Sequence, residues 1–257
     1  MGFDLSQARV LLTNDDGIEA PGIALLEKLI APLVKEVWLV APRYEQSATS
    51  HALTIHSPLR VHHMDERRKA VAGTPTDSVL LALRHIMPEP PDLVLSGINS
   101  GGNIGGDVLY SGTVGAAMEA ALCGVRSIAF SLNKTPRGPA RWATAEAHLV
   151  PVLQHVLTAD WRSDVIVNVN FPDVDPDDVR GVQLVAQGRR KPGGRLQDGV
   201  DPRGNPYVWV STEREQAYHT PGTDEDLIEE GWITVTPLTA DLTCQNTMQT
   251  LSHLWPA

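Results

Sequence analysis

This chain has 257 residues, of which 42% are hydrophobic and 20% are charged, so it suits one large domain or a core domain with an appendage. Its net charge of −10 argues against broad nucleic-acid binding, which needs a basic surface to neutralise phosphates. No run approaches the roughly 18 apolar residues of a membrane span, and the N-terminus has no basic region before an apolar stretch. We therefore expect a cytoplasmic protein that binds neither membranes nor nucleic acid stably.

The first half of the chain alternates short apolar runs with amphipathic stretches, and further strands and a helix follow to residue 170. This alternation is typical of βαβ units, in which helices cover a parallel sheet. The predicted strands are residues 9–14, 37–41, 60–64, 92–96, 127–131 and 165–170. The predicted helices are residues 21–33, 75–87, 111–122 and 141–157. We therefore predict an α/β core with a mostly parallel sheet over residues 1–180.

After Phe171-Pro172 the character of the chain changes, and we predict that residues 181–257 form a β-rich C-terminal extension. Residues 173–178 are acidic and rich in turn formers, and residues 188–206 are rich in Gly, Pro and charge. Strands are predicted at residues 207–211 and 232–237. An extended β arm cannot bury its apolar face alone, so we expect this part to pack on a partner subunit and to return to the core.

The first candidate site is Asn14-Asp15-Asp16-Gly17, directly after the first predicted strand. Ligands of open parallel sheets bind at the carboxyl ends of the strands. Two adjacent desolvated carboxylates repel each other and need a proton or a cation, and a divalent metal with oxygen ligands would satisfy them. The same four residues are also ordinary turn formers, so this motif alone does not decide between a turn and a metal site.

Two further strand ends carry polar side chains. Ser47 lies in a hydroxyl-rich loop after the second strand, and Asn99 lies in a segment with five glycines between Gly97 and Gly106. That glycine density suits a backbone that wraps closely around a ligand. The next helix begins near Ser111-Gly-Thr113, and a helix N-terminus attracts anions. No Gly-Lys-Ser/Thr follows the glycines, and the first strand has no dinucleotide-binding fingerprint, so the combination predicts a metal and phosphate site.

These motifs resemble those of the SurE family of survival-protein nucleotidases. The matching segments run in order over most of the chain: Leu12–Gly22, Gly73–Asp77, Ser96–Gly105, Tyr110–Val114, Asp201–Tyr207, Gly222–Asp224, Ile233–Leu238 and Asp241–Thr243. The resemblance implies a Rossmann-like three-layer sandwich with a C-terminal β-hairpin extension that exchanges between subunits, in a homodimer or homotetramer. It also implies hydrolysis of nucleoside 5′- and 3′-monophosphates, with short polyphosphate as a further candidate substrate.

The resemblance also implies roles for individual residues. One divalent metal ion per subunit, Mg²⁺ or Mn²⁺, would be held by Asp15, Asp16, Ser47 and Asn99, and either aspartate could act as general base. The phosphate side would be formed by Asn14, Asn103, Ser111, Gly112 and Thr113. Two positions depart from the family pattern, because Ala48 follows Ser47 where glycine is usual and Gly102 stands where proline is common.

Two alternatives bear on this hypothesis. A non-catalytic regulator could keep the same ligands and bind a metal or a nucleotide without hydrolysing it. A second possible metal site, formed by His51, His56, His62 and His63, is disfavoured because their spacing fits no standard site, and we expect solvated or packed imidazoles.

Overall fold

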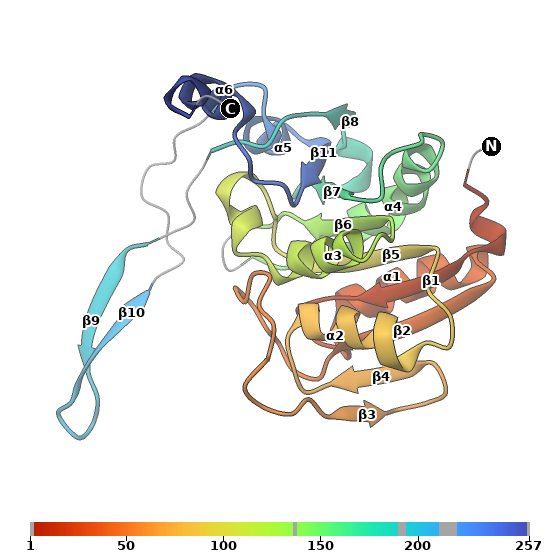
Figure 1. Cartoon of the computed structure of the whole chain (residues 1–257), viewed down its shortest axis with the longest axis horizontal. Helices are drawn as coiled ribbons and strands as arrows, with labels where there is room; N and C mark the ends of the chain where they lie inside the picture. Colours follow the sequence, from red (N-terminus) through yellow and green to blue (C-terminus); the bar gives the residue numbers. More distant parts are fainter. Residues whose placement is uncertain (1–2, 136–137, 190–193, 211–219, 256–257) are drawn as a thin grey trace.

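The computed structural model describes residues 3–135, 138–189, 194–210 and 220–255, which form an α/β fold around one nine-stranded sheet (Figure 1). The sheet is mostly parallel; β3 runs antiparallel to β4, and β11 antiparallel to β7. In sheet order the strands are β3 (Val61–His63), β4 (Arg68–Val71), β2 (Glu36–Pro42), β1 (Arg9–Thr13), β5 (Leu93–Ser100), β6 (Ser127–Leu132), β7 (Val165–Phe171), β11 (Trp232–Thr239) and β8 (Gly181–Leu184). The predicted fold class is confirmed.

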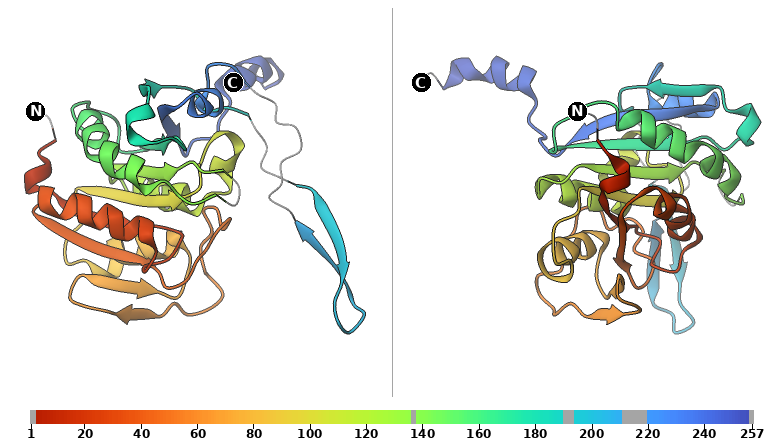
Figure 2. Two further views of the ribbon diagram at one scale, coloured as in Figure 1. Left: turned by 180° about the vertical axis from the view of Figure 1, so that it is seen from behind. Right: turned by 90° about the vertical axis from the view of Figure 1, so that its right-hand side faces the viewer.

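Helices cover both faces of this sheet, which gives three layers (Figures 1 and 2). On one face lie α1 (Pro21–Ile30) and α4 (Trp142–Val156), and on the other α2 (Pro75–Leu81) and α3 (Gly112–Leu122). Successive side chains of a strand point to opposite faces, so Val10 and Leu12 of β1 pack in the core below α1, and Leu11 packs in the core below α2 and α3. All three are fully buried, as expected for a strand between two helix layers.

Local sequence signals explain where the helices begin and end. The Thr74 hydroxyl accepts from the Asp77 N–H, and the Asp77 carboxylate accepts from the Thr74 N–H, which is a capping box at the start of α2. The predicted helix 21–33 is α-helical only to Ile30 and continues as a 3-10 turn, Ala31–Leu33, because Pro32 has no N–H to donate. The predicted helix 75–87 likewise changes to a π-helical turn, Ala82–Ile86, after α2.

The C-terminal part divides into two portions. Strands β8 and β11 complete the main sheet, whereas β9 (Leu196–Val200) and β10 (Pro206–Val210) form a separate antiparallel hairpin that projects from the body (Figures 1 and 2). The hairpin matches the expected extension; Ser211, the last residue of the predicted strand 207–211, lies outside the described residues. The division at residue 180 and the use of the arm in assembly stay predictions.

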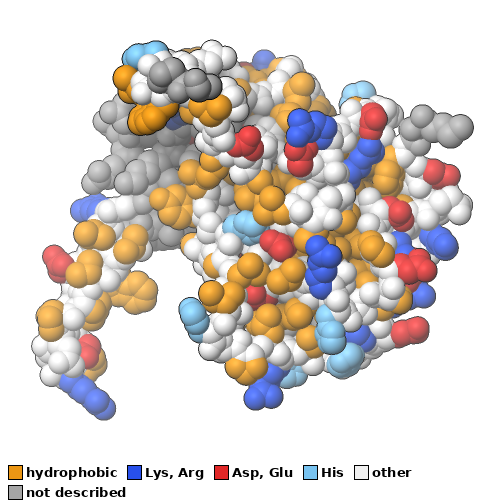
Figure 3. Space-filling view, in the orientation of Figure 1, with side chains coloured by type: hydrophobic (Ala, Val, Ile, Leu, Met, Phe, Trp, Pro, Cys, Tyr) orange, Lys and Arg blue, Asp and Glu red, His pale blue; other side chains and the backbone are white. Residues whose placement is uncertain are grey.

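Several C-terminal elements carry exposed apolar side chains. On the hairpin these include Trp209, which is 65% exposed and forms an edge-to-face contact with Tyr207, and apolar atoms are visible along the arm in Figure 3.

Two helices follow, α5 (Asp224–Glu229) and α6 (Gln245–Leu251). In the part of the chain that is described, no helix has the length and apolarity needed to cross a membrane.

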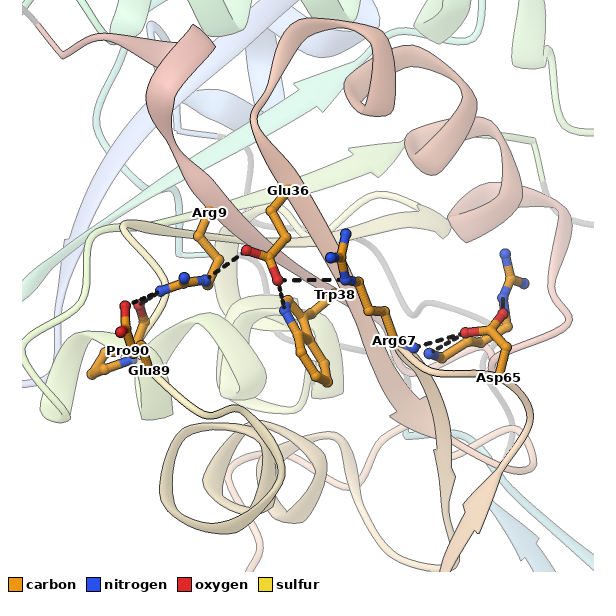
Figure 4. Close-up of polar contacts among 8 residues, drawn as sticks. Arg9, Glu36, Trp38, Asp65, Arg67, Glu89 and Pro90 are labelled. Carbon is orange, nitrogen blue, oxygen red and sulfur yellow. Dashed lines mark hydrogen bonds and ion pairs between the residues drawn. The ribbon is translucent and has the colours of Figure 1, made fainter.

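The amino end of the central strand β1 is held by an ion-pair network (Figure 4). Arg9 contacts Glu36 and Glu89, both at 3.0 Å, and Glu36 also accepts from the Trp38 indole at 2.7 Å. Arg67 adds a second cation to Glu36 at 3.4 Å. Burial alone would raise the pKa of Glu36, but the bonds from Trp38 and Arg9 outweigh it and the pKa is lowered.

Candidate active site

Three neighbouring strands bring the predicted site residues together. β1 pairs in parallel with β2 on one side and with β5 on the other, so the loops after all three strands meet at one edge of the sheet. A cleft of about 540 Å³ opens there. Its lining includes six of the residues expected from the sequence: Asp15, Asp16, Ser47, Asn99, Asn103 and Ser111. Asn14, Gly112 and Thr113 lie beside the cleft without lining it.

Asp15 is the most buried carboxylate of the cleft, with 4% of its surface exposed. The Thr113 hydroxyl donates to Asp15 Oδ1 at 2.5 Å, and the Thr113 N–H also donates to this carboxylate. Gly112 permits this close approach, because a Cβ there would lie 2.8 Å from the Asp15 Cβ. The start of α3 therefore packs directly on Asp15, and Gly112 and Thr113 support this carboxylate.

Desolvation makes the charged form of Asp15 unfavourable. Burial raises its pKa to about 6; the hydrogen bond from Thr113 opposes the shift, and the charge of Asp16 adds to it. Asp16 is less buried, and its Oδ2 accepts from the Ser100 N–H at 3.0 Å. Burial raises the pKa of Asp16 as well, with the Ser100 N–H opposing, the charge of Glu45 adding and the charge of Lys134 opposing.

The turn after β1 depends on Asn14 and Gly17. Asn14 is fully buried, and its Nδ2 donates to the Gly17 carbonyl at 2.8 Å. Gly17 has a φ of 101°, a conformation that side chains rarely adopt. The turn and the site are therefore compatible: the turn formers close the loop, and the loop places the two carboxylates in the cleft.

The loop that carries Ser47 is exposed and strained. The Ser47 hydroxyl donates to Glu45 Oε1 at 2.9 Å, and the loop is anchored where the Gln46 N–H donates to the Asp15 carbonyl at 2.8 Å. Ala48 has a φ of 59° and Ser50 a φ of 54°. The position where the family usually has glycine therefore does adopt the left-handed conformation that favours glycine.

Asn99 reaches the cleft through an irregularity in β5. The β5–β6 register shifts between Ser96 and Asn99, so one extra residue is accommodated and the end of the strand is re-aimed. Asn99 Nδ2 donates to the Gly101 carbonyl at 2.8 Å. With its amide nitrogen used in this way, the amide oxygen is the end that Asn99 has available for a cation.

Asn103 is held by a set of polar side chains that the sequence alone did not single out. Its N–H donates to Asn170 Oδ1 at 2.8 Å and its Nδ2 donates to the Ser131 hydroxyl at 2.8 Å. Its carbonyl accepts from Asn168 at 2.8 Å and from Asn170 at 3.1 Å. These partners lie on β6 and β7, and polar side chains inside the buried runs 127–131 and 165–170 were the only signal for them.

The glycine-rich segment is also tied to the C-terminal part of the chain. Asp224 is fully buried and accepts from the Gly105 N–H at 2.9 Å and the Gly188 N–H at 2.7 Å. Gly105 has a φ of 54°, and a Cβ there would collide with Glu225. The start of α5 thus fixes the loop that carries Asn103.

Lys134 is the basic side chain in the lining of this cleft as described, and sequence reasoning missed it. It follows β6, and its neighbours are held on both sides: the Asn133 N–H donates to the Phe171 carbonyl and the Thr135 N–H donates to Asp173, both at 2.8 Å. A lone lysine in an irregular loop gives no sequence signal until the order of the strands is known.

The histidines do not form a metal centre among the described residues, which contain no group of three or more His, Cys, Asp or Glu side chains arranged to hold an ion. His51 contacts the buried Glu119 at 2.8 Å, and His62 contacts Arg43 at 3.2 Å. Each of these two imidazoles therefore has a charged side-chain partner. The Asp, Ser and Asn set of the cleft is a different kind of donor group, made of oxygens only.

The fold and the cleft define an α/β protein with an acidic cleft at the strand ends of a mostly parallel sheet. Residues 10–193 match the family model described as survival protein SurE. The chain is 49% identical over 252 residues to a 5′-nucleotidase SurE of Rhodospirillum rubrum, covering 97% of each protein, and 48% identical over 249 residues to one of Paramagnetospirillum magneticum, covering 96% of each. The crystal structure of a SurE protein from Aquifex aeolicus is similar, with a TM-score of 0.81, 36% identity, and coverage of 96% of this chain and 99% of that one. The chain belongs to the SurE family.

Proposed function

We propose that the protein is a divalent-metal-dependent phosphatase that hydrolyses nucleoside 5′- and 3′-monophosphates, with short polyphosphate as a further candidate substrate. The observation that carries the proposal is the pair of desolvated carboxylates, Asp15 and Asp16, which line an open cleft beside the start of α3. The names of its relatives as 5′-nucleotidases support the choice of substrate. A non-catalytic regulator with the same ligands is the alternative.

The donor set fits a hard divalent cation. Asp15 and Asp16 would supply two carboxylates, Ser47 a hydroxyl and Asn99 an amide oxygen, all of which line the same cleft. Burial raises the pKa of both aspartates, and the hydrogen bonds from Thr113 and Ser100 only partly oppose this, which supports a cation at the pair. One ion of Mg²⁺ or Mn²⁺, when bound, supplies charge neutralisation and lowers the pKa of water in the site.

The side chains of the cleft would then divide the work. Ser111, Asn103 and Lys134 face the cleft and would hold the phosphate oxygens, while Thr113 and Gly112 act through Asp15, and Asn14 through the turn. A water oxygen would attack phosphorus in line, the ester P–O bond would break, and the nucleoside oxygen would finally take up the proton that the water loses. Asp15 or Asp16 would accept the proton that the attacking water loses.

Assembly and location belong to the same proposal. The exposed Tyr207 and Trp209 would be covered by a partner subunit in a homodimer or homotetramer. Cytoplasmic location stays a prediction. Size-exclusion chromatography with light scattering tests the assembly, since a monomer in solution would contradict it.

Phosphate release tests the activity directly. Purified protein is incubated with nucleoside 5′-monophosphates, 3′-monophosphates and tripolyphosphate, with Mg²⁺ or Mn²⁺ and with excess chelator. The proposal expects release from the nucleotides with metal and none with chelator. Binding of nucleotide without release under any metal would support the regulator instead.

A further inference from the structure

A second cavity, of about 460 Å³, adjoins the cleft of the aspartates. Three residues line both: Asp16, Glu45 and Ser100. The second cavity extends from this junction towards the start of α1 and the start of α4. Its volume falls within the roughly 300–1,000 Å³ of small-molecule sites. A ligand with its phosphate in the cleft therefore has space for its remaining part on the other side of the junction.

Two aromatic side chains line this second cavity. Tyr44, in the loop after β2, is 65% exposed, so part of its ring is open to a ligand in the cavity. Trp142, the first residue of α4, is half-buried and packs on Gly22 of α1, where a Cβ would lie 3.1 Å from the indole ring. Both can offer a ring to a planar group, and stacking of this kind does not depend on a particular base.

The Tyr44 ring contacts a cation on its own loop. The Arg43 guanidinium lies 5.1 Å from the centre of the Tyr44 ring, and Arg43 also contacts His62 at 3.2 Å. The backbone on this side is fixed by a bond from the Arg43 N–H to the Val71 carbonyl at 2.7 Å. A ring that is already ordered loses less entropy when a ligand stacks on it.

The charge of the second cavity indicates which part of a ligand it accepts. Among the described residues of its lining, three are carboxylates, Asp16, Glu19 and Glu45, and one is a cation, Arg43. These carboxylates disfavour a second phosphate beside them. Carboxylates accept hydrogen bonds from hydroxyl and amino groups, which are the donors that a ribose and a base carry.

We propose that this second cavity is the nucleoside subsite, with the base against Tyr44 and Trp142 and the ribose at the junction beside Glu45. The inference rests on the proposed function, because it takes the phosphate to lie in the cleft. It specifies a substrate with one phosphate and a neutral, aromatic leaving portion, and it makes Tyr44 a specificity-determining residue outside the metal and phosphate groups.

Two substrates that differ only in the base separate base stacking by Tyr44 from a general effect of Tyr44 on catalysis. Steady-state kinetics are measured on adenosine 5′-monophosphate and on ribose 5-phosphate, for the wild type, Tyr44→Ala and Tyr44→Phe. We expect Tyr44→Ala to lower kcat/KM for the nucleotide about tenfold, mostly through KM, since base–aromatic stacking is lost. Ribose 5-phosphate should change less than about twofold, and Tyr44→Phe should restore the nucleotide value. Equal effects of Tyr44→Ala on the two substrates, or no effect on either, would overturn the subsite.

Binding of adenosine, which has no phosphate, separates a failure of the subsite from a failure of the proposed function. Isothermal titration calorimetry of the intact protein should show adenosine binding that Tyr44→Ala weakens about tenfold. If the wild type hydrolyses neither phosphate ester, the proposed function fails, and Tyr44-dependent adenosine binding still supports the subsite. If adenosine does not bind, or binds equally to Tyr44→Ala, the subsite is wrong whatever the activity.

Discussion

The carboxylates at the two ends of strand β1 have pKa values shifted in opposite directions. At the amino end, the Glu36 carboxylate is in contact with two arginines and an indole N–H, and its pKa is lowered. At the carboxyl end, Asp15 and Asp16 accept hydrogen bonds from Thr113 and Ser100, but their pKa values are raised. The amino end is stabilised by ion pairs, whereas the carboxyl end holds two carboxylates whose charge a proton or a bound cation would compensate.

The position of each end in the fold explains the difference. Arg9 and Glu36 are opposite residues of paired strands, β1 and β2, so the sheet itself brings them together. Asp15 lies under the first turn of α3, where Gly112 lets the helix pack closely and exclude water. Close packing stabilises the rest of the fold. At this end of β1 it desolvates two carboxylates, which is unfavourable for their charged forms.

The largest effect is expected from neutralising the carboxyl end. Asp16→Asn should lower the metal-dependent hydrolysis of nucleoside monophosphates at least a hundredfold, because it removes one charged donor from the proposed metal site. Phosphate release measures the loss, and circular dichroism should show an unchanged fold. Asp160→Asn is the matched control, since Asp160 is exposed and pairs with Arg126 away from the cleft. An Asp16→Asn variant with full activity would remove the aspartate pair from the mechanism.

The second prediction concerns the pH dependence of the free energy of unfolding in metal-free protein, which should reveal the buried carboxylate of Asp15. The pKa of Asp15 is about 6 when folded and near 3.8 when unfolded, so the folded state holds its proton more tightly and stability falls as the pH rises from about 4 to 6. A pKa shift of roughly two units corresponds to a loss of about 3 kcal/mol in the free energy of unfolding. Urea unfolding with chelator should show this loss in the wild type relative to Asp15→Asn. If the difference between the two proteins stays constant from pH 4 to pH 7, the carboxylate is compensated within the protein.

At the amino end of β1, the free energy of unfolding should change with pH in the opposite direction. Glu36→Gln should lower the free energy of unfolding by about 2 kcal/mol at neutral pH, because charged hydrogen bonds from Arg9 and Trp38 are weakened. Since the pKa of Glu36 is lowered on folding, its contribution is present above pH 4.5 and is lost as the pH falls. Urea unfolding at pH 7 and pH 4 measures both effects. Activity should be retained, and a large loss would show that the two ends are coupled.

The smallest effect concerns the loop that carries Ser47. Ala48→Gly should raise the free energy of unfolding by up to about 1 kcal/mol, because the φ of 59° is strained for alanine and the gain is partly offset by the entropy of glycine when unfolded. Ala31→Gly is the control: Ala31 is exposed with a φ of −54°, so glycine there should destabilise. Thermal unfolding compares them, and destabilisation by both variants would contradict the strain at Ala48.

The sequence predicted the parts of the site that depend on short-range patterns. Asp15, Asp16, Ser47 and Asn99 each follow an apolar run, and the ends of parallel strands meet at one edge, so their placement in one cleft was predictable. Lys134, Asn168 and Asn170 were missed because their place depends on the order β5-β6-β7, which no local pattern specifies. Tyr44 was within a recognised loop, but its exposure was visible only in the structure.

The fold shows the same limit. Strand β4 was missed because Arg68 and Lys69 interrupt its apolar pattern, although β4 pairs with β2 inside the sheet. The predicted strand 92–96 was too short, since β5 continues through the bulge to Ser100. Helix α5 was missed because its six residues are too few to show a helical period, and its start is held by a contact with the glycine-rich loop. In each case a tertiary contact outweighs the local propensity.

Titration of the purified, chelator-treated protein with Mn²⁺ by isothermal calorimetry tests the central claim most directly. The wild type should bind one ion per chain, and Asp16→Asn should bind at least tenfold more weakly, since one of the two carboxylates is lost. The Glu36→Gln variant should bind Mn²⁺ as the wild type does, because Glu36 lies opposite Arg9 at the amino end of β1, away from the cleft. Absence of binding to the wild type, or equal binding to Asp16→Asn, would contradict the assignment of a metal site to the Asp15–Asp16 pair.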